Sequence, residues 1–162
     1  MGLDMYLSKR SYVKNWSFQK DEQKHKATVR LNGKIRKDIK PDRVSYIVEE
    51  VAYWRKANHI HKWFVEQTAG GVDECQPSHV SMEQLVELKE LCEAVLDRKG
   101  DDDFISENLP TGSGFFFGGT DYDEYYYNDC QETVDIIKGL IKEAEKKPEG
   151  CYDAEFEYRA SW

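Results

Sequence analysis

The last nine residues of the chain, 154–162, alternate between apolar and polar side chains. The apolar positions are Ala154, Phe156, Tyr158, Ala160 and Trp162. A period of two places these side chains on one face of a β-strand. Such a strand is stable only beside other strands and beneath elements that cover its apolar face. The chain therefore has to build a sheet with at least one buried face.

Two further segments predict strands for this sheet. Leu3, Met5 and Leu7 alternate with less apolar residues near the N-terminus. Residues 28–36 contain Asn32-Gly33 between two short strand patterns, which predicts a hairpin because this pair accepts the positive φ angles of a type I′ turn. The polar residues 14–26, interrupted only by Trp16 and Phe18, predict a long loop.

Three segments between residue 44 and residue 148 predict helices. The first runs from about Val44 to Gln67, the second follows a capping box of Ser81 and Gln84, and the third follows Thr120. We therefore predict one α+β domain over residues 1–162. Its small antiparallel sheet would consist of the N-terminal strand, the Asn-Gly hairpin and the C-terminal strand, packed against about three helices.

The net charge of −8 is distributed unevenly along the chain. Residues 1–43 hold 12 Lys/Arg and 5 Asp/Glu, a net charge of +7, whereas residues 44–162 hold 11 and 26, a net charge of −15. If the basic hairpin and the acidic C-terminal strand share one sheet, these charges neutralise one another. On this premise direct binding of nucleic acid is not expected. A hairpin that contacts phosphate and an acidic mimic of nucleic acid are the alternatives.

Composition and residue spacing exclude several classes of protein. The mean hydropathy is −0.78, the apolar runs are too short to span a bilayer, and the first residues lack a signal-peptide pattern, so we expect a cytoplasmic protein without membrane contact. The four cysteines contain no CxxC spacing and are expected to be reduced. We expect no metal and no cofactor. His59 and His61 would point about 200° apart on a helix. A nucleophile pair of Cys75 with His61 or His79 has no supporting local motif.

The first predicted helix carries polar residues inside its apolar stripe. Asn58 and His61 share this stripe with Trp54, so both are expected to be hydrogen-bonded in the folded protein. They either hold the structure together or line a pocket, with Arg55 pairing with an anionic ligand and His61 exchanging protons. Trp63 projects to the opposite side, where it is either an exposed binding anchor or covered by the sheet.

A glycine-rich aromatic loop precedes the third helix. It lacks the Gly-Lys-Ser/Thr of a phosphate-binding loop, and its glycines would let Phe115, Phe116 and Phe117 pack tightly or contact a ligand. Four tyrosines follow within residues 122–127, and they cannot all face inward. We expect Tyr122 or Tyr127 to be exposed. With Tyr125 and the neighbouring carboxylates, they would form an acidic aromatic surface.

Three motifs carry a resemblance to a known group of proteins. They are MGLDMYL at residues 1–7, YWRKANHIHKWFV at residues 53–65 and SGFFFG at residues 113–118, together with the turn from Val72-Asp73 to Cys75. In this combination the chain resembles a widespread group of uncharacterised phage, prophage and bacterial proteins. The resemblance spans most of the chain and implies a mobile-element context in the cytoplasm, but it implies no catalytic residue.

We therefore predict a non-catalytic accessory protein that binds a host or phage macromolecule, most simply a protein. Its contact residues would be Tyr122 and Tyr125 of the acidic aromatic surface, or Trp63. The alternative is a small-molecule binder or enzyme with a pocket formed by Trp54, Arg55, Asn58, His61 and the Phe115–Phe117 loop. The sequence leaves the oligomeric state open.

Overall fold

The computed structural model describes residues 2–162, and Met1 lies outside the described part. The strands are β1 (Asp4–Tyr12), β2 (Arg30–Leu31), β3 (Lys34–Ile35), β4 (Tyr46–Arg55), β5 (Ser78–Val80) and β6 (Glu155–Ser161). The α-helices are α1 (Asn58–Thr68), α2 (Met82–Asp97), α3 (Asp102–Asn108) and α4 (Glu124–Glu145). Two 3-10 helices, η1 (Asp21–Gln23) and η2 (Pro41–Arg43), lie between β1 and β4. The predicted α+β class is confirmed.

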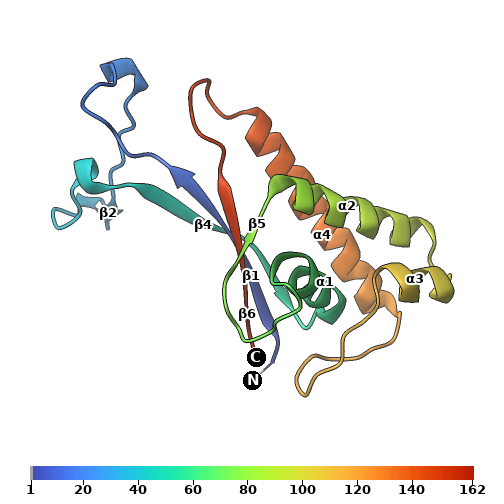
Figure 1. The fold of residues 1–162 in the computed structure, drawn as a ribbon. Coiled ribbons are helices and arrows are strands. Elements are labelled where there is room, and N and C mark those ends of the chain that lie inside the picture. Colours follow the sequence, from blue (N-terminus) through green and yellow to red (C-terminus); the bar gives the residue numbers. More distant parts are fainter. Residues whose placement is uncertain (1) are drawn as a thin grey trace.

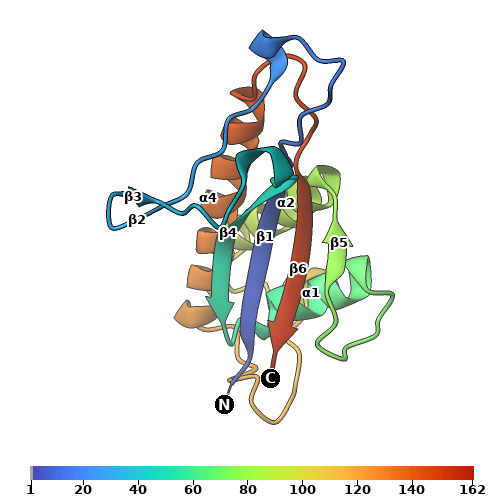
Figure 2. The same cartoon turned by 90° about the vertical axis from the view of Figure 1, so that its left-hand side faces the viewer.

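The main sheet has four strands in the order β4-β1-β6-β5, and every neighbouring pair is antiparallel (Figure 2). The inward side chains of the central strand β1, Met5 and Leu7, are fully buried. The alternation at the C-terminus is confirmed, because Phe156, Tyr158 and Ala160 of β6 all point into the core. Alternation thus identifies which face of the sheet is covered.

The α-helices lie on one side of the sheet, and the other face of the sheet is left open (Figure 1). The capping box that starts α2 is confirmed. The N–H of Gln84 donates to the Ser81 hydroxyl at 3.1 Å, and the N–H of Ser81 donates to the Gln84 side chain at 2.9 Å. Between sheet and helices, the indole N–H of Trp54 on β4 donates to the Thr133 hydroxyl on α4 at 3.0 Å.

The predicted helix from about Val44 to Gln67 is wrong over its first half. Residues Tyr46–Arg55 form β4, and the chain turns at Lys56, which has a φ of 61°, before α1 begins at Asn58. The β-branched and aromatic residues at the start of this segment suit a strand. The strand is stabilised by antiparallel pairing with β1, which cannot be recognised from the local sequence pattern. The short elements β5 and α3 were not predicted either.

The predicted Asn-Gly hairpin is present, but it does not join the main sheet. Asn32 and Gly33 have φ angles of 49° and 79°, as a type I′ turn requires. The two strands β2 and β3 pair only with each other among the described residues, as a separate two-stranded sheet. The strand that pairs with β1 on the side away from β6 is β4 and not the hairpin.

The hairpin belongs to a long insertion between β1 and β4, residues 13–45, which we call the basic extension. It projects from the end of the sheet, away from the helices (Figures 1 and 2). It holds ten Lys/Arg and four Asp/Glu, a net charge of +6 with His25 neutral. Within residues 2–162, its ion pairs are Lys24–Asp21 and Arg36–Asp38, both internal to the extension.

The expected neutralisation of the basic hairpin by the C-terminal strand is therefore wrong. Glu155 of β6 is paired with Arg10 of β1 in the strand register, and Lys9 of β1 binds Glu143 of α4 at 2.9 Å. These cations belong to the sheet and not to the hairpin. Over the described residues, no helix combines the length and the apolar character needed to cross a bilayer.

Candidate functional site

Asn58, the first residue of α1, ties this helix to the glycine-rich loop. Its side chain is buried, and its Nδ2 donates to the carbonyl oxygens of Phe117 and Gly119 at 2.9 and 2.8 Å. Its Oδ1 accepts from the backbone N–H of Gly112 at 3.0 Å. The expected hydrogen bonding of Asn58 is confirmed. Because all these partners are intramolecular, the amide holds the loop and is not available to a ligand.

His61 lies one turn further along α1, in a buried hydrogen-bonded chain. Its Nδ1 lies 2.7 Å from the Tyr158 hydroxyl, and its Nε2 lies 2.9 Å from an Asp73 carboxylate oxygen. Burial, together with the charges of Asp73 and Cys75, raises the pKa of Tyr158. The cavity beside this chain has a volume of only about 10 Å³, which is about enough for one water molecule. Cys75 also lines this cavity, but both ring nitrogens of His61 already have partners.

The other members of the expected ligand pocket do not come together. Trp54 is buried in the core, whereas Arg55 is exposed on the open face of the sheet, 3.9 Å from Asp4. With Asn58 and His61 fully engaged, the predicted pocket for an anionic small molecule is not formed. Trp63 is also buried, so it is not an exposed anchor.

His59 is a buried histidine on the opposite side of α1. It stacks against Tyr126 with ring centroids 4.1 Å apart, and its Nε2 has no hydrogen-bond partner in the part of the chain that the structure describes. Burial lowers the pKa of His59 to about 3. The imidazole is therefore neutral at pH 7 and packs as part of the core.

The three phenylalanines of the loop have different surroundings. Phe117 is half-buried, with its ring centroid 5.3 Å from His61 and 6.0 Å from Trp162. Phe116 is half-buried and Phe115 is 93% exposed. The absence of a side chain at Gly114 is required here, because a Cβ would lie 2.6 Å from the Phe117 ring. The loop thus packs through Phe117 and presents Phe115 to solvent.

The acidic aromatic surface is only partly as predicted. Tyr127 is buried and Tyr122 is half-buried, so neither of the two residues expected to be exposed is fully so. Tyr125 is 80% exposed instead. We call the segment from Phe115 to Tyr125 the acidic end, since it exposes these two aromatic residues and the carboxylates of Asp121, Asp123 and Glu124.

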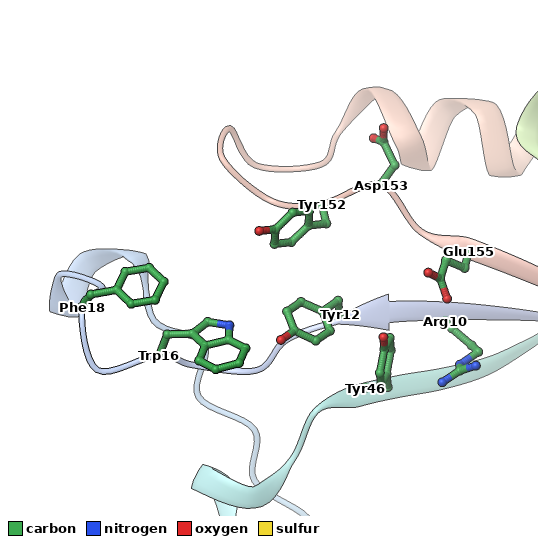
Figure 3. A pocket seen from close by; sticks show the side chains of 8 residues that line it. All are labelled: Arg10, Tyr12, Trp16, Phe18, Tyr46, Tyr152, Asp153 and Glu155. Atoms are coloured by element: carbon green, nitrogen blue, oxygen red, sulfur yellow. The ribbon is translucent and has the colours of Figure 1, made fainter.

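The structure brings together a second set of aromatic side chains that the sequence analysis did not identify. They surround an open recess of about 690 Å³ at the base of the basic extension (Figure 3). We call it the aromatic recess, and it is lined by Arg10, Tyr12, Trp16, Phe18, Tyr46, Tyr152, Asp153 and Glu155. These residues come from the end of β1, the start of β4, the extension, the segment before β6 and the first residue of β6.

Several rings of the aromatic recess are exposed to solvent. Trp16 and Phe18 stack at 6.3 Å, and they are 45% and 82% exposed. Tyr152, which is 74% exposed, meets the edge of Tyr12 at 5.6 Å. Figure 3 shows Trp16 and Phe18 on one side of the recess and Tyr152 on the other.

Cations lie directly beside these rings. The Arg10 guanidinium lies 4.4 Å from the centre of the Tyr46 ring, and the Lys14 ammonium lies 5.3 Å from the centre of the Trp16 ring. The signal for this site in the sequence was the pair of isolated aromatics in an otherwise polar, basic segment. Tyr46 and Tyr152, by contrast, lie in segments that only the fold brings near.

The described residues contain no group of three or more His, Cys, Asp or Glu side chains that could hold a metal ion. No protein-family model, curated protein or solved structure matches this chain. The resemblance to phage and prophage proteins therefore stays a prediction. The function has to be inferred from the surfaces themselves.

Proposed function

We propose that this protein is a non-catalytic accessory protein that binds single-stranded nucleic acid through the aromatic recess and the basic extension. The observation that carries the proposal is the position of Trp16 and Phe18 within a segment of net charge +6, at the edge of an open recess. Proteins that bind single strands combine a basic surface, which follows the phosphates, with exposed aromatic rings on which bases stack. The mobile-element context implied by the sequence resemblance fits such a role.

A single strand fits the recess better than a duplex does. The exposed rings of Trp16, Phe18 and Tyr152 can stack only with unstacked bases, which a duplex does not offer. The carboxylates of Asp153 and Glu155 line the same recess and would repel a phosphate, but they can accept hydrogen bonds from exocyclic amino groups of bases. In this arrangement the bases enter the recess and the phosphates lie along the extension.

Fluorescence anisotropy of fluorescein-labelled 12-nucleotide DNA, at about 50 and 200 mM salt, tests this proposal. Base stacking contributes roughly 1–3 kcal/mol per base, so Phe18→Ala, which removes one exposed ring, should bind roughly 5- to 150-fold more weakly. Phe115→Ala is the matched control, because it removes another exposed phenylalanine, 93% against 82% for Phe18, at the acidic end. It should leave the affinity within about twofold.

A second pair of variants tests whether the lysines of the extension, and not those elsewhere in the protein, contact the phosphates. Lys34→Gln on the hairpin should lower the salt dependence of binding by roughly 0.7 in log–log slope if it contacts one phosphate. Lys142→Gln on α4 is the control and should leave the slope unchanged. Failure to bind any oligonucleotide at low salt, or equal losses in both aromatic variants, would contradict the proposal.

Contact with a protein through the acidic end is the second candidate function. It is supported by Tyr125, an aromatic side chain that is 80% exposed and lies next to exposed carboxylates, and by Phe115, which is 93% exposed in the preceding loop. This surface suits a basic peptide segment. A labelled Lys/Arg-rich peptide should then bind the Tyr125→Ala variant more weakly than the wild-type protein and bind the Trp16→Ala variant equally well. The reverse pattern would exclude the acidic end as the binding surface.

A further inference from the structure

A thiol and an imidazole from distant parts of the chain meet next to the aromatic recess. Cys151 lies in the segment between α4 and β6, and His25 lies in the basic extension. The Cys151 Sγ is 3.8 Å from His25 Nε2, which is within hydrogen-bonding range for sulfur. The two residues are 126 positions apart in the sequence, so only the fold brings them together.

The backbone of His25 is held firmly in this position. Asn15 Nδ2 donates to the carbonyl oxygen of His25, and the N–H of His25 donates to Asn15 Oδ1, both at 2.7 Å. The remaining ring nitrogen, Nδ1, is buried without a hydrogen-bond partner among the described residues. Because no protein group fixes the tautomer through Nδ1, Nε2 can accept the thiol proton or donate to the thiolate.

The pair lines a cavity of about 740 Å³, within the range of small-molecule sites. Its apolar lining includes Val13, Met82, Pro148 and Phe156. Its charged lining includes Lys9, Lys146 and Lys147 against Glu83, Glu143 and Glu155. Cys151 is partly exposed, so a small reagent can reach its sulfur through this cavity.

We propose that Cys151 is a modification site, at which its thiol forms a mixed disulfide with a small-molecule disulfide while His25 accepts the thiol proton. The Cys151 sulfur attacks one sulfur of the reagent, a new S–S bond forms, and the reagent's S–S bond breaks. The second half of the reagent leaves as a thiolate that takes up a proton. The disulfide reagent is the oxidant, so electrons and atoms balance.

The other three cysteines lack this combination. Cys92 and Cys130 are fully buried on α2 and α4, and a hydrogen bond with Cys130 together with burial raises the pKa of Cys92. Cys75 is partly exposed like Cys151, but the nearby His61 is hydrogen-bonded at both ring nitrogens. Cys75 therefore serves as the comparison thiol within the same molecule.

The test is the reaction of the folded protein with oxidised glutathione from pH 6 to pH 9, followed by peptide mass spectrometry. About 3% of an ordinary thiol is ionised at pH 7, which leaves room for a large acceleration. We expect Cys151 to react roughly tenfold faster than Cys75 at pH 7. His25→Gln should remove this advantage and return the rate profile of Cys151 to that of an ordinary thiol.

The result for His25→Gln and one control variant distinguish proton acceptance by His25 from mere shielding of the sulfur. If His25 merely covers the sulfur, His25→Gln makes Cys151 react faster and leaves the shape of the pH profile unchanged, which would overturn the proposal. His79→Gln alters another histidine of the same cavity and should leave the rate within about twofold. Labelling of Cys75 before Cys151 in the wild-type protein, or equal rates for both, would also overturn it. Circular dichroism checks that each variant is folded.

Discussion

The hydrogen bonds of Asn58 predict that this one amide stabilises the glycine-rich loop and, through it, the whole fold. Asn58→Ala removes three hydrogen bonds, to Phe117, Gly119 and Gly112. A protein hydrogen bond contributes about 0.5–1.5 kcal/mol net, so the sum lies at roughly 1.5–4.5 kcal/mol. Water can replace part of this at the exposed Gly119. We therefore expect the free energy of unfolding to fall by about 3 kcal/mol.

Urea denaturation, followed by circular dichroism, measures this loss. With a slope of roughly 2 kcal/mol per molar urea, the midpoint should fall by roughly 1.5 M. The control is Asn128→Ala, which alters an exposed asparagine on α4 and should change the urea midpoint only slightly. Asn58→Asp keeps an acceptor for Gly112 but sets a carboxylate oxygen against two carbonyls, so it should cost at least as much as alanine. A loss below about 1 kcal/mol for Asn58→Ala would refute the reasoning.

Three further predictions concern buried polar groups. Thr133→Val leaves the Trp54 N–H without its acceptor and should cost about 1–3 kcal/mol in urea denaturation. Burial lowers the pKa of His59 to about 3, below its value in the unfolded chain, so protonation at low pH favours the unfolded chain. The free energy of unfolding should therefore fall by about 2 kcal/mol between pH 6.5 and pH 5, and this fall should be absent in His59→Phe. Burial, with the charges of Glu132 and Asp123, raises the pKa of Asp129 to about 7. Ionised Asp129 therefore destabilises the fold as pH rises from about 4 to 7, so Asp129→Asn should raise the melting temperature at pH 8 and not at pH 4.

The elements that the sequence predicted correctly are those with a local signal. The alternation of β6, the capping box of α2 and the turn at Asn32 each depend on residues close in the chain. β4 was missed because its apolar residues fit a helical period as well as a strand, and only pairing with β1 decides between them. The same limit applies to β5, whose three residues gain stability from β6.

The polar residues of α1 could be predicted although the helix boundaries were wrong. Asn58 and His61 both lie in α1, so the prediction that they share one helix face holds although the preceding residues form a strand. That they are buried and hydrogen-bonded follows from the cost of burying an unpaired polar group. Their partners, the glycine-rich loop, Asp73 and Tyr158, could not be predicted, because those contacts depend on the packing of three separate segments.

The charge distribution has a different meaning once the topology is known. The basic extension is separated from a remainder that holds 13 Lys/Arg and 27 Asp/Glu, a net charge of −14. A nucleic acid attracted to the extension is repelled by this remainder as soon as it runs past the aromatic recess. The bound strand should therefore be short, because the phosphates it can place favourably are those near the extension. An oligonucleotide of about six nucleotides should then bind almost as tightly as one of twenty, after correction for the number of registers. A salt slope that keeps steepening with length would contradict this confinement.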